Sequence, residues 1–325
     1  MKNLLLVELT RLRWRRAVVV LLVACLLVPV AICLGAAWNT RPFSDADVAE
    51  AERLAQFEAD QPYIQQEIER CQENPEMYGG GPDVDCVEMI TPSAANYLYR
   101  QTLDVGSVLD NEATAVVSLL AVVLLVLGTT FVGHDWNTGS ISNQLLFEPR
   151  RRRVWAAKGL AVLLVGLVVG ALALLVFWGA VGVLVAQRDI AVEPGQWAVV
   201  RNTAARGVLL VALSGFLGYA LTMLLRSTVA TLAIGLGVAA AGSIAVLATF
   251  GEGAQRWLLP TNAYAVLDNG YEYYVWSPAC DVMVQGGTDP CTQTISLGAG
   301  ATYLAVVLAV VVVASLVSFR RRDLP

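Results

Sequence analysis

The polar segment between residues 133 and 158 holds the side chains best suited to chemistry with another molecule. It contains His134, the only histidine of the chain, followed by Asp135 and Trp136, and four consecutive arginines stand at 150–153. Catalysis by this histidine would need a zinc-binding H-E-x-x-H pattern or a nucleophile motif, and the sequence has neither. An aromatic side chain among charged neighbours is instead typical of residues that anchor protein interfaces. We therefore interpret this segment as a docking surface for a soluble partner.

Long apolar runs on both sides hold this segment in place. The chain of 325 residues is 56% hydrophobic and only 15% charged. A run of about 20 apolar residues makes a helix long enough to cross the ~30 Å hydrocarbon core of a bilayer. The sequence predicts six such spans, at 17–38, 113–132, 156–186, 207–225, 228–250 and 298–319. The expected fold class is therefore an all-α polytopic membrane protein.

The distribution of charge orients the six spans. The segments that precede, connect and follow the six spans alternate between the two sides of the membrane and so form two sets. One set holds fourteen of the 22 Lys and Arg residues but only four of the 27 Asp and Glu residues. Because cytoplasmic loops are enriched in Lys and Arg, we expect this set, and with it both termini, to face the cytoplasm. The set comprises an amphipathic interfacial helix at 1–16, the segment at 133–158, which holds the loop at 133–155 and Lys158 at the entry to the third span, the turn at Arg226 and a tail at 320–325.

The two longest outer segments differ in character. Residues 39–112 carry 16 of the 27 acids and show helical periodicity, which predicts a helical outer cap. We expect its acids to form a solvated face, with cation binding or substrate selection as the alternative. Residues 251–297 include a run at 257–267 that is apolar but too short to span, so we expect a re-entrant or interfacial helix there.

Four cysteines fall in these outer segments. Cys71 and Cys86 lie in the first, and Cys280 and Cys291 lie in the second. Two close pairs on the outer side suit an oxidising compartment. We expect the disulfides Cys71–Cys86 and Cys280–Cys291, although the sequence leaves the other two pairings open.

The predicted spans contain no Asp, Glu or His, and Lys158 stands only at the start of the third. Ionisable groups in the bilayer mark proton relays and ion-coupled carriers, so neither is expected. The chain also lacks the G-x-x-x-x-G-K-S/T loop that binds ATP phosphates. We expect no catalytic residue, cofactor or metal on this chain, and no nucleic-acid partner. A cargo path should be apolar or lined by hydroxyls, for which the candidates are Ser118, Thr129, Thr130, Ser214 and Thr222.

Several short motifs together resemble the ABC-2 type permeases, the transmembrane subunits of bacterial ATP-binding cassette exporters. The first lies in the docking segment: Asp135 and Gly139, then Leu145-Leu146, then Pro149-x-Arg151, then Lys158. The others are the outer segment beginning at Trp257 and the ending Phe319-Arg320-Arg321-Arg322-Asp323-Leu324. The resemblance covers the whole chain. One departure is Asp135, where the family more often has glutamate, and this change keeps the charge.

The resemblance implies a complex of two permease subunits, as a homodimer or heterodimer, with two cytoplasmic ATPase subunits that carry ATP and Mg²⁺. The loop after the second span would be a coupling helix that docks in a groove of the ATPase, here through His134, Asp135, Trp136, Gly139, Pro149, Arg150 and Arg151. ATP-driven closure would then switch a central cavity from inward to outward access in the bacterial plasma membrane. Apolar spans suggest a lipid, a hydrophobic peptide or an amphiphilic drug as the exported cargo, and the arginines can also contact anionic membrane lipids.

Two other classes of protein fit parts of the pattern. A polytopic enzyme with its chemistry in the outer cap would need paired carboxylates or a histidine there, and no histidine is present. A membrane sensor or scaffold, which binds an outer ligand and docks a cytoplasmic signalling partner, is the alternative function, because the docking loop suits it equally well.

Overall fold

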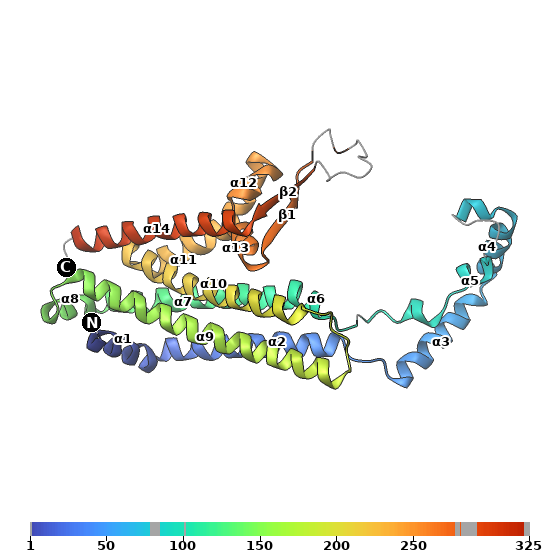
Figure 1. Cartoon of the computed structure of the whole chain (residues 1–325), viewed down its shortest axis with the longest axis horizontal. Helices are drawn as coiled ribbons and strands as arrows, with labels where there is room; N and C mark the ends of the chain where they lie inside the picture. Colours follow the sequence, from blue (N-terminus) through green and yellow to red (C-terminus); the bar gives the residue numbers. More distant parts are fainter. Residues whose placement is uncertain (1, 79–84, 101, 277–279, 281–290, 322–325) are drawn as a thin grey trace. The chain divides into compact units, whose positions relative to one another are not determined.

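The computed structural model describes residues 2–78, 85–100, 102–276, 280 and 291–321. The chain folds into two compact units, which Figure 1 shows in the colours of the sequence. The first, which we call the bundle, comprises Met1–Leu34 and Asp104–Pro325. The second, which we call the outer unit, is Gly35–Leu103.

Six helices are long and apolar enough to cross a membrane, which agrees with the six predicted spans. They are α2 (Arg16–Asn39), α6 to α7 (Val105–Asn137), α9 (Arg151–Gln187), α10 (Gln196–Leu225), α11 to α12 (Thr228–Phe250) and α14 (Leu297–Arg321). Two of them contain a π-helical turn. In the second spanning helix, α6 (Val105–Val108) continues through the π-helical turn η3 (Leu109–Ala113) into α7 (Thr114–Asn137). In the fifth, α11 (Thr228–Gly237) continues through the π-helical turn η4 (Val238–Gly242) into α12 (Ser243–Phe250).

Several of these helices continue past the apolar runs. The second begins eight residues before the predicted span and ends five residues after it, so it includes Asp110, Glu112 and Asp135. The third begins at Arg151, which places Lys158 two turns inside the helix. The expectation that the spans carry no acids therefore holds for the apolar runs but not for the whole helices. The helices continue past their apolar runs because backbone hydrogen bonds form within a helix whether its side chains are apolar or polar.

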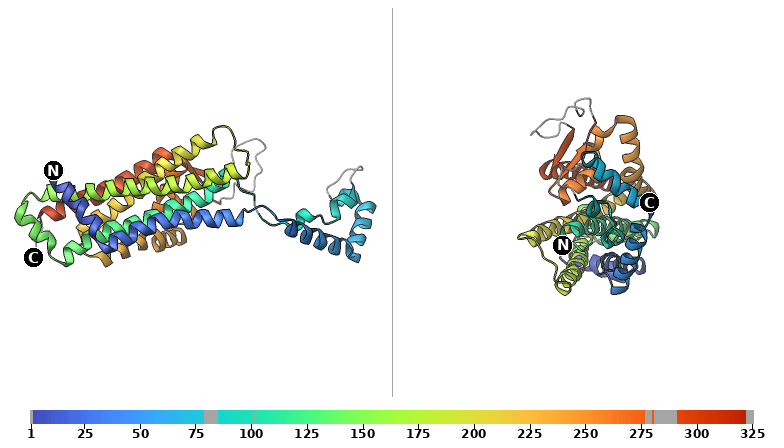
Figure 2. Two further views of the ribbon diagram at one scale, coloured as in Figure 1. Left: turned by 90° about the horizontal axis from the view of Figure 1, so that it is seen from below. Right: turned by 90° about the vertical axis from the view of Figure 1, so that its right-hand side faces the viewer.

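The centre of the bundle is formed by α7, α9 and α10, with α14 packed on α10 (Figures 1 and 2). Small residues allow α7 and α10 to approach closely. A Cβ added at Gly128 would collide with the carbonyl oxygen of Gly215, and one added at Gly218 would collide with that of Leu125. Gly166 of α9 faces Ala212 of α10 in the same way. This is the small-residue packing that membrane helices use in place of a hydrophobic driving force.

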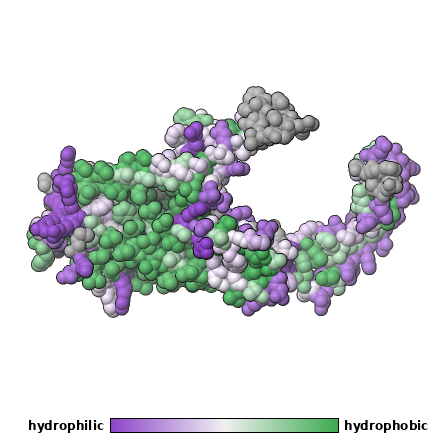
Figure 3. All heavy atoms as spheres, viewed as in Figure 1, coloured by the Kyte–Doolittle hydropathy of each residue, from purple (hydrophilic) through white to green (hydrophobic). Residues whose placement is uncertain are grey.

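Figure 3 shows a continuous hydrophobic band across the visible face of the bundle helices, with hydrophilic residues at the end that carries α1 (Lys2–Trp14) and α8 (Ser140–Phe147). The end of α14 lies at this same end of the bundle. We call it the polar end. Residues 322–325 of the C-terminal motif lie outside the described residues.

The opposite end of the bundle is not purely helical, which corrects the all-α prediction. After η5 (Glu252–Trp257) and α13 (Leu259–Leu267), β1 (Gly270–Tyr274) pairs antiparallel with β2 (Thr292–Ser296). Aromatic and β-branched residues favour strands, and the two strands are rich in tyrosine and threonine. Tyr273 and Ile295 are buried with Ala265 of α13. The disulfide Cys280–Cys291 lies within the segment that connects the two strands. Residues 277–279 and 281–290 of that segment lie outside the described ranges.

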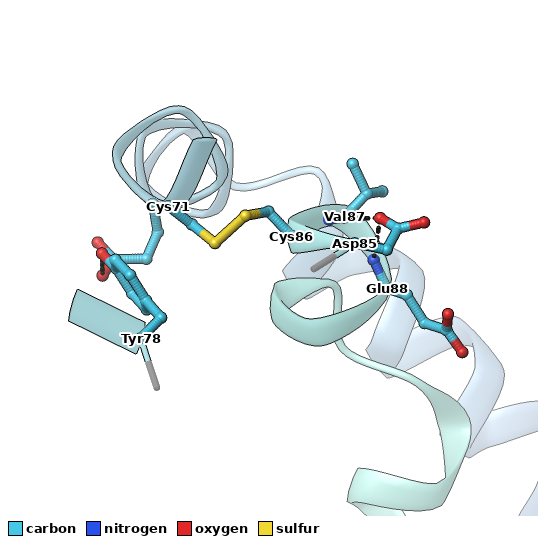
Figure 4. Close-up of a disulfide and its surroundings, with 7 residues drawn as sticks. Cys71, Tyr78, Asp85, Cys86, Val87 and Glu88 are labelled. Carbon is cyan, nitrogen blue, oxygen red and sulfur yellow. Dashed lines mark hydrogen bonds between the residues drawn. A yellow bond between two sulfur atoms is a disulfide. The ribbon is translucent and has the colours of Figure 1, made fainter. Parts of the chain in front are cut away.

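The outer unit is a set of short helices. They are α3 (Asp45–Ala59), α4 (Pro62–Glu73), η1 (Pro75–Tyr78), α5 (Cys86–Ile90) and η2 (Ala94–Tyr97). Ser44 and Asp47 form a capping box that starts α3, and Pro62 occupies the first turn of α4, where its missing N–H is harmless. Cys71 of α4 is bonded to Cys86 of α5, with Cα atoms 5.9 Å apart (Figure 4). The disulfides are the two that we expect from proximity in the sequence.

Candidate functional site

A left-handed glycine makes the turn at the centre of the polar end. α7 ends at Asn137, and Gly139 has φ +67°, a conformation that glycine adopts without steric penalty. This turn allows α8 to start immediately at Ser140. α8 ends at Phe147, because Glu148 is extended before Pro149, as the residue preceding a proline usually is. The sequence pattern thus produces a short helix between two spans.

Beneath this turn lies a cluster of three charged side chains with no exposed surface, which we call the buried charge cluster. It consists of Glu8 of α1, Asp135 of α7 and Lys158 of α9. The ammonium Nζ of Lys158 donates to Oε2 of Glu8 at 2.9 Å and to Oδ2 of Asp135 at 2.6 Å. One lysine therefore joins three helices that are far apart in the sequence.

Two arginines complete the cluster from its edge. Arg15 donates to the carboxylate of Asp135 and to the carbonyl oxygen of Phe131. Arg11 donates to Oγ of Ser140 at 2.5 Å and lies 3.5 Å from Oδ1 of Asp135. The side chains of Arg11 and Arg15 are 30% and 18% exposed, so they close the cluster toward solvent.

The cluster also reaches α8. The amide Nε2 of Gln144 donates to Oε1 of Glu8 at 2.6 Å. Together with the bond from Arg11 to Ser140, this ties the first residue and the middle of α8 to α1. Since Glu8 and Asp135 are both bonded to Lys158, α8 is connected through polar contacts to α1, α7 and α9. Removing one partner of a buried ion pair typically costs about 3–5 kcal/mol, because it leaves an uncompensated charge.

The structure divides the predicted docking residues between surface and interior. His134, Gly139, Pro149 and Arg150 are exposed. Asp135 is not: its side chain has no exposed surface in this chain, where it contacts Lys158, Arg15 and Arg11. The expectation that Asp135 itself forms part of the docking surface is therefore corrected to a role inside the bundle, beneath that surface.

Trp136 and Arg151 also turn inward. The Trp136 ring lies between the guanidinium of Arg226, 4.7 Å from the ring centre, and the ring of Phe319 at 6.3 Å. Arg151 donates through Nη1 to the carbonyl oxygens of Phe319 at 3.1 Å and Arg320 at 3.3 Å. These bonds join the start of α9 to the end of α14, where the positive charge of Arg151 interacts favourably with the helix C-terminus.

A second set of contacts extends this connection along α9. The indole nitrogen of Trp155 donates to Oγ of Ser315 in α14 at 3.1 Å. The hydroxyl of Tyr219 in α10 donates to the carbonyl oxygen of Trp155 at 2.5 Å. The start of α9 is thus bonded to both α10 and α14.

The most exposed apolar residues of the polar end were absent from the predicted site. Leu146 is 81% exposed and Phe147 is 90% exposed, and both stand at the end of α8. A run of apolar residues within a polar loop was the available signal. Glu8 was missed for a different reason, since nothing near it in the sequence indicates a partner 150 residues away.

The predicted path hydroxyls do not gather at one surface. Thr129, Thr130 and Thr222 donate to carbonyl oxygens four residues earlier in their own helices. Ser214 of α10 donates to the carbonyl oxygen of Ala121 in α7 at 2.7 Å, and Ser118 is exposed. Within this chain, Ser214 is therefore part of the packing between α7 and α10.

Comparison with known proteins yields a match over nearly the whole chain. A family described as ABC-2 family transporter protein matches residues 6–324. No curated protein and no solved structure matches the chain.

Proposed function

Because the chain belongs to the ABC-2 transporter family, and is therefore a multi-pass permease subunit that works with an ATPase subunit, we propose that α8 is the surface on which the ATPase docks. The observation that carries this proposal is the exposure of Leu146 and Phe147 at the end of a short helix between two spans. A few well-packed side chains near the centre of a contact supply most of the binding energy of an interface, and aromatic residues such as Phe147 are enriched in interfaces.

The surroundings of α8 support the same role. Arg150, Arg152 and Arg153 are exposed next to it, and they can pair with acidic side chains of the ATPase or with anionic lipid headgroups. His134, near the end of α7, and Gly139, directly before α8, are also exposed. Aromatic residues and arginine, which this surface combines, are enriched at protein interfaces.

The buried charge cluster supports transmission of force from α8. Glu8, Asp135 and Lys158 connect α8 to α1, α7 and α9, and Arg151 connects α9 to α14. Rigid-body motions of helices are a common means of switching between two states. When the ATPase subunits close on ATP, a push on α8 therefore moves several spans together.

In the complete transporter, two permease subunits act with two ATPase subunits, and ATP and Mg²⁺ are bound by the ATPase while this chain has no enzymatic activity. The basic polar end and both termini face the cytoplasm of a bacterial cell, following the distribution of Lys and Arg. The cargo is exported by alternating access, and the apolar spans favour a lipid, a hydrophobic peptide or an amphiphilic drug.

The docking proposal is tested by placing a charge on the apolar tip. Phe147→Asp should reduce capture of the co-expressed ATPase subunit at least tenfold, and with it cargo-stimulated ATP hydrolysis, because loss of an interface anchor costs about 2 kcal/mol or more. The matched control is Phe57→Asp in the outer unit, where the side chain is 65% exposed. Unchanged capture by Phe147→Asp and by Leu146→Asp would rule out α8 as the docking helix.

A further inference from the structure

The outer unit contains a groove of about 600 Å³ within its own short helices. Glu58 lies at the end of α3 and Tyr63 at the start of α4. Glu88 and Met89 of α5 contribute further lining, and Tyr97 and Tyr99 complete it from the segment that includes η2. A volume of this size is within the range of sites for small organic molecules.

Covalent and hydrogen bonds hold the walls of this groove. The disulfide from Cys71 to Cys86 fixes α5 against α4, as Figure 4 shows. Oδ1 of Asp85 accepts from the backbone nitrogens of Val87 and Glu88, which starts α5 at a defined residue. The groove is therefore part of the folded unit rather than a gap between loose loops.

The lining combines negative charge with aromatic rings. Its charged residues are Glu58 and Glu88, with no basic side chain among the lining residues. Within the described ranges, neither of the two carboxylates has an ion-pair partner. The unit as a whole, Gly35–Leu103, has thirteen acids and four bases in its sequence. An unneutralised acidic groove favours a positively charged ligand.

The three tyrosines define the kind of cation. Tyr63 and Tyr99 are exposed, and Tyr97 is half-buried. Glu58, Tyr97 and Tyr99 line the same groove, and burial, together with the carboxylate of Glu58 and the neighbouring Tyr99, raises the pKa of the Tyr97 hydroxyl. An aromatic face attracts an ammonium group at close range, whereas inorganic Ca²⁺ or Mg²⁺ requires a shell of oxygen ligands.

We propose that this groove is a binding site for an organic cation with an apolar body, of the quaternary ammonium class. Glu58 and Glu88 neutralise its charge, the faces of Tyr63, Tyr97 and Tyr99 surround the ammonium group, and Met89 contacts the apolar part. Met is well suited to such irregular apolar contacts. The site goes beyond the docking function of α8 and does not depend on it.

The test is a titration of the full chain, in micelles of the uncharged detergent dodecyl maltoside, which has no ammonium group, with benzyltrimethylammonium. Isothermal titration calorimetry should detect saturable binding, and the neutral benzyl alcohol should not compete. Glu58→Gln should weaken binding at least fivefold, and Glu58→Gln with Glu88→Gln should abolish it. The matched control is Glu52→Gln, which removes the same charge from an exposed position of α3 outside the groove.

Four outcomes would overturn the proposal. Equal weakening by Glu52→Gln would mean attraction to the net charge alone, and equal binding of benzyl alcohol would mean an apolar site. Unchanged affinity in all variants would place any binding elsewhere. If Tyr97→Leu weakens the binding of benzyltrimethylammonium less than twofold, and Ca²⁺ or Mg²⁺ displaces this ligand, the groove is an inorganic cation site. Phe147→Asp should leave the affinity unchanged, so failure of the docking proposal and failure of this one are distinguishable.

Discussion

Replacing Lys158 by methionine should destabilise the bundle strongly, because Lys158 is a fully buried cation that donates to both fully buried acids, whereas Arg11, which lies near both acids, is 30% exposed. Methionine has a similar length and no charge, so the change removes the ammonium group with little change in volume. Oε2 of Glu8 and Oδ2 of Asp135 lie 2.9 and 2.6 Å from the same nitrogen. The two oxygens are therefore no more than about 5.5 Å apart, and without Lys158 two negative charges face each other inside the protein with only the partly exposed Arg11 and Arg15 beside them.

The structure sets the size of the effect. Two unit charges at that distance repel by at least about 3 kcal/mol at an effective dielectric constant of about 20. Removal of one partner from a buried ion pair costs about 3–5 kcal/mol in other proteins, so the two estimates agree. At roughly 2–4 °C per kcal/mol for a chain of this size, the unfolding midpoint should fall by at least about 6 °C.

The chain carries its own reporters for this measurement. Cys25 and Cys33 are its free cysteines and both are buried, so a thiol-reactive fluorescent dye will label them only as the bundle opens. Lys2→Met is the matched control, because Lys2 is the only other lysine and is exposed. It should leave the midpoint within about 1 °C of the original, as expected for a surface substitution.

A second variant tests the cause of the effect. Adding Glu8→Gln to Lys158→Met removes one of the two facing carboxylates and should raise the midpoint above that of Lys158→Met alone. Such non-additivity is expected for residues within one network. The reasoning is refuted if Lys158→Met unfolds with the midpoint of Lys2→Met, or if the double variant is less stable than Lys158→Met.

Two further predictions concern packing and pH. Gly128→Ala should lower the unfolding midpoint in the same dye assay, because its Cβ meets the carbonyl oxygen of Gly215 and overpacking typically costs about 1–3 kcal/mol. The control is Gly35→Ala, whose Cβ meets nothing within 4 Å and which should leave the midpoint unchanged. Equal midpoints for the two variants would contradict the packing seen between α7 and α10. Hydrogen bonds from Ser44, with a smaller effect of Arg100, lower the pKa of Asp47 from its ordinary value of 3.8. The stabilisation that the Asp47 carboxylate gives to the start of α3 is therefore present above that value. It is lost as the pH falls through the lower pKa of the folded state. Hydrogen-exchange protection of the first turn of α3, corrected for the intrinsic rate, should therefore fall on acidification, and Asp47→Asn should remove this pH dependence.

The spans and the turn between α7 and α9 could be predicted because their signals are local. An apolar run of sufficient length specifies a membrane helix wherever it stands, and Gly139 and Pro149 mark the ends of α8 through their own backbone preferences. The strand pair was missed because its two halves are about 20 residues apart and each is only five residues long. Short segments of this kind have no periodicity that separates them from loops.

The sequence alone thus determined which segments can lie in a membrane, where the polar segment between the second and third spans falls and which cysteines are close enough to pair, because each depends on composition and spacing along the chain. Only the tertiary structure decided which side chains of that segment are available to a partner. Asp135 is buried with Glu8 and Lys158, which are 150 residues apart, whereas Leu146 and Phe147 of the same segment are exposed. Burial depends on which helix covers a residue, and that is settled by packing between distant parts of the chain.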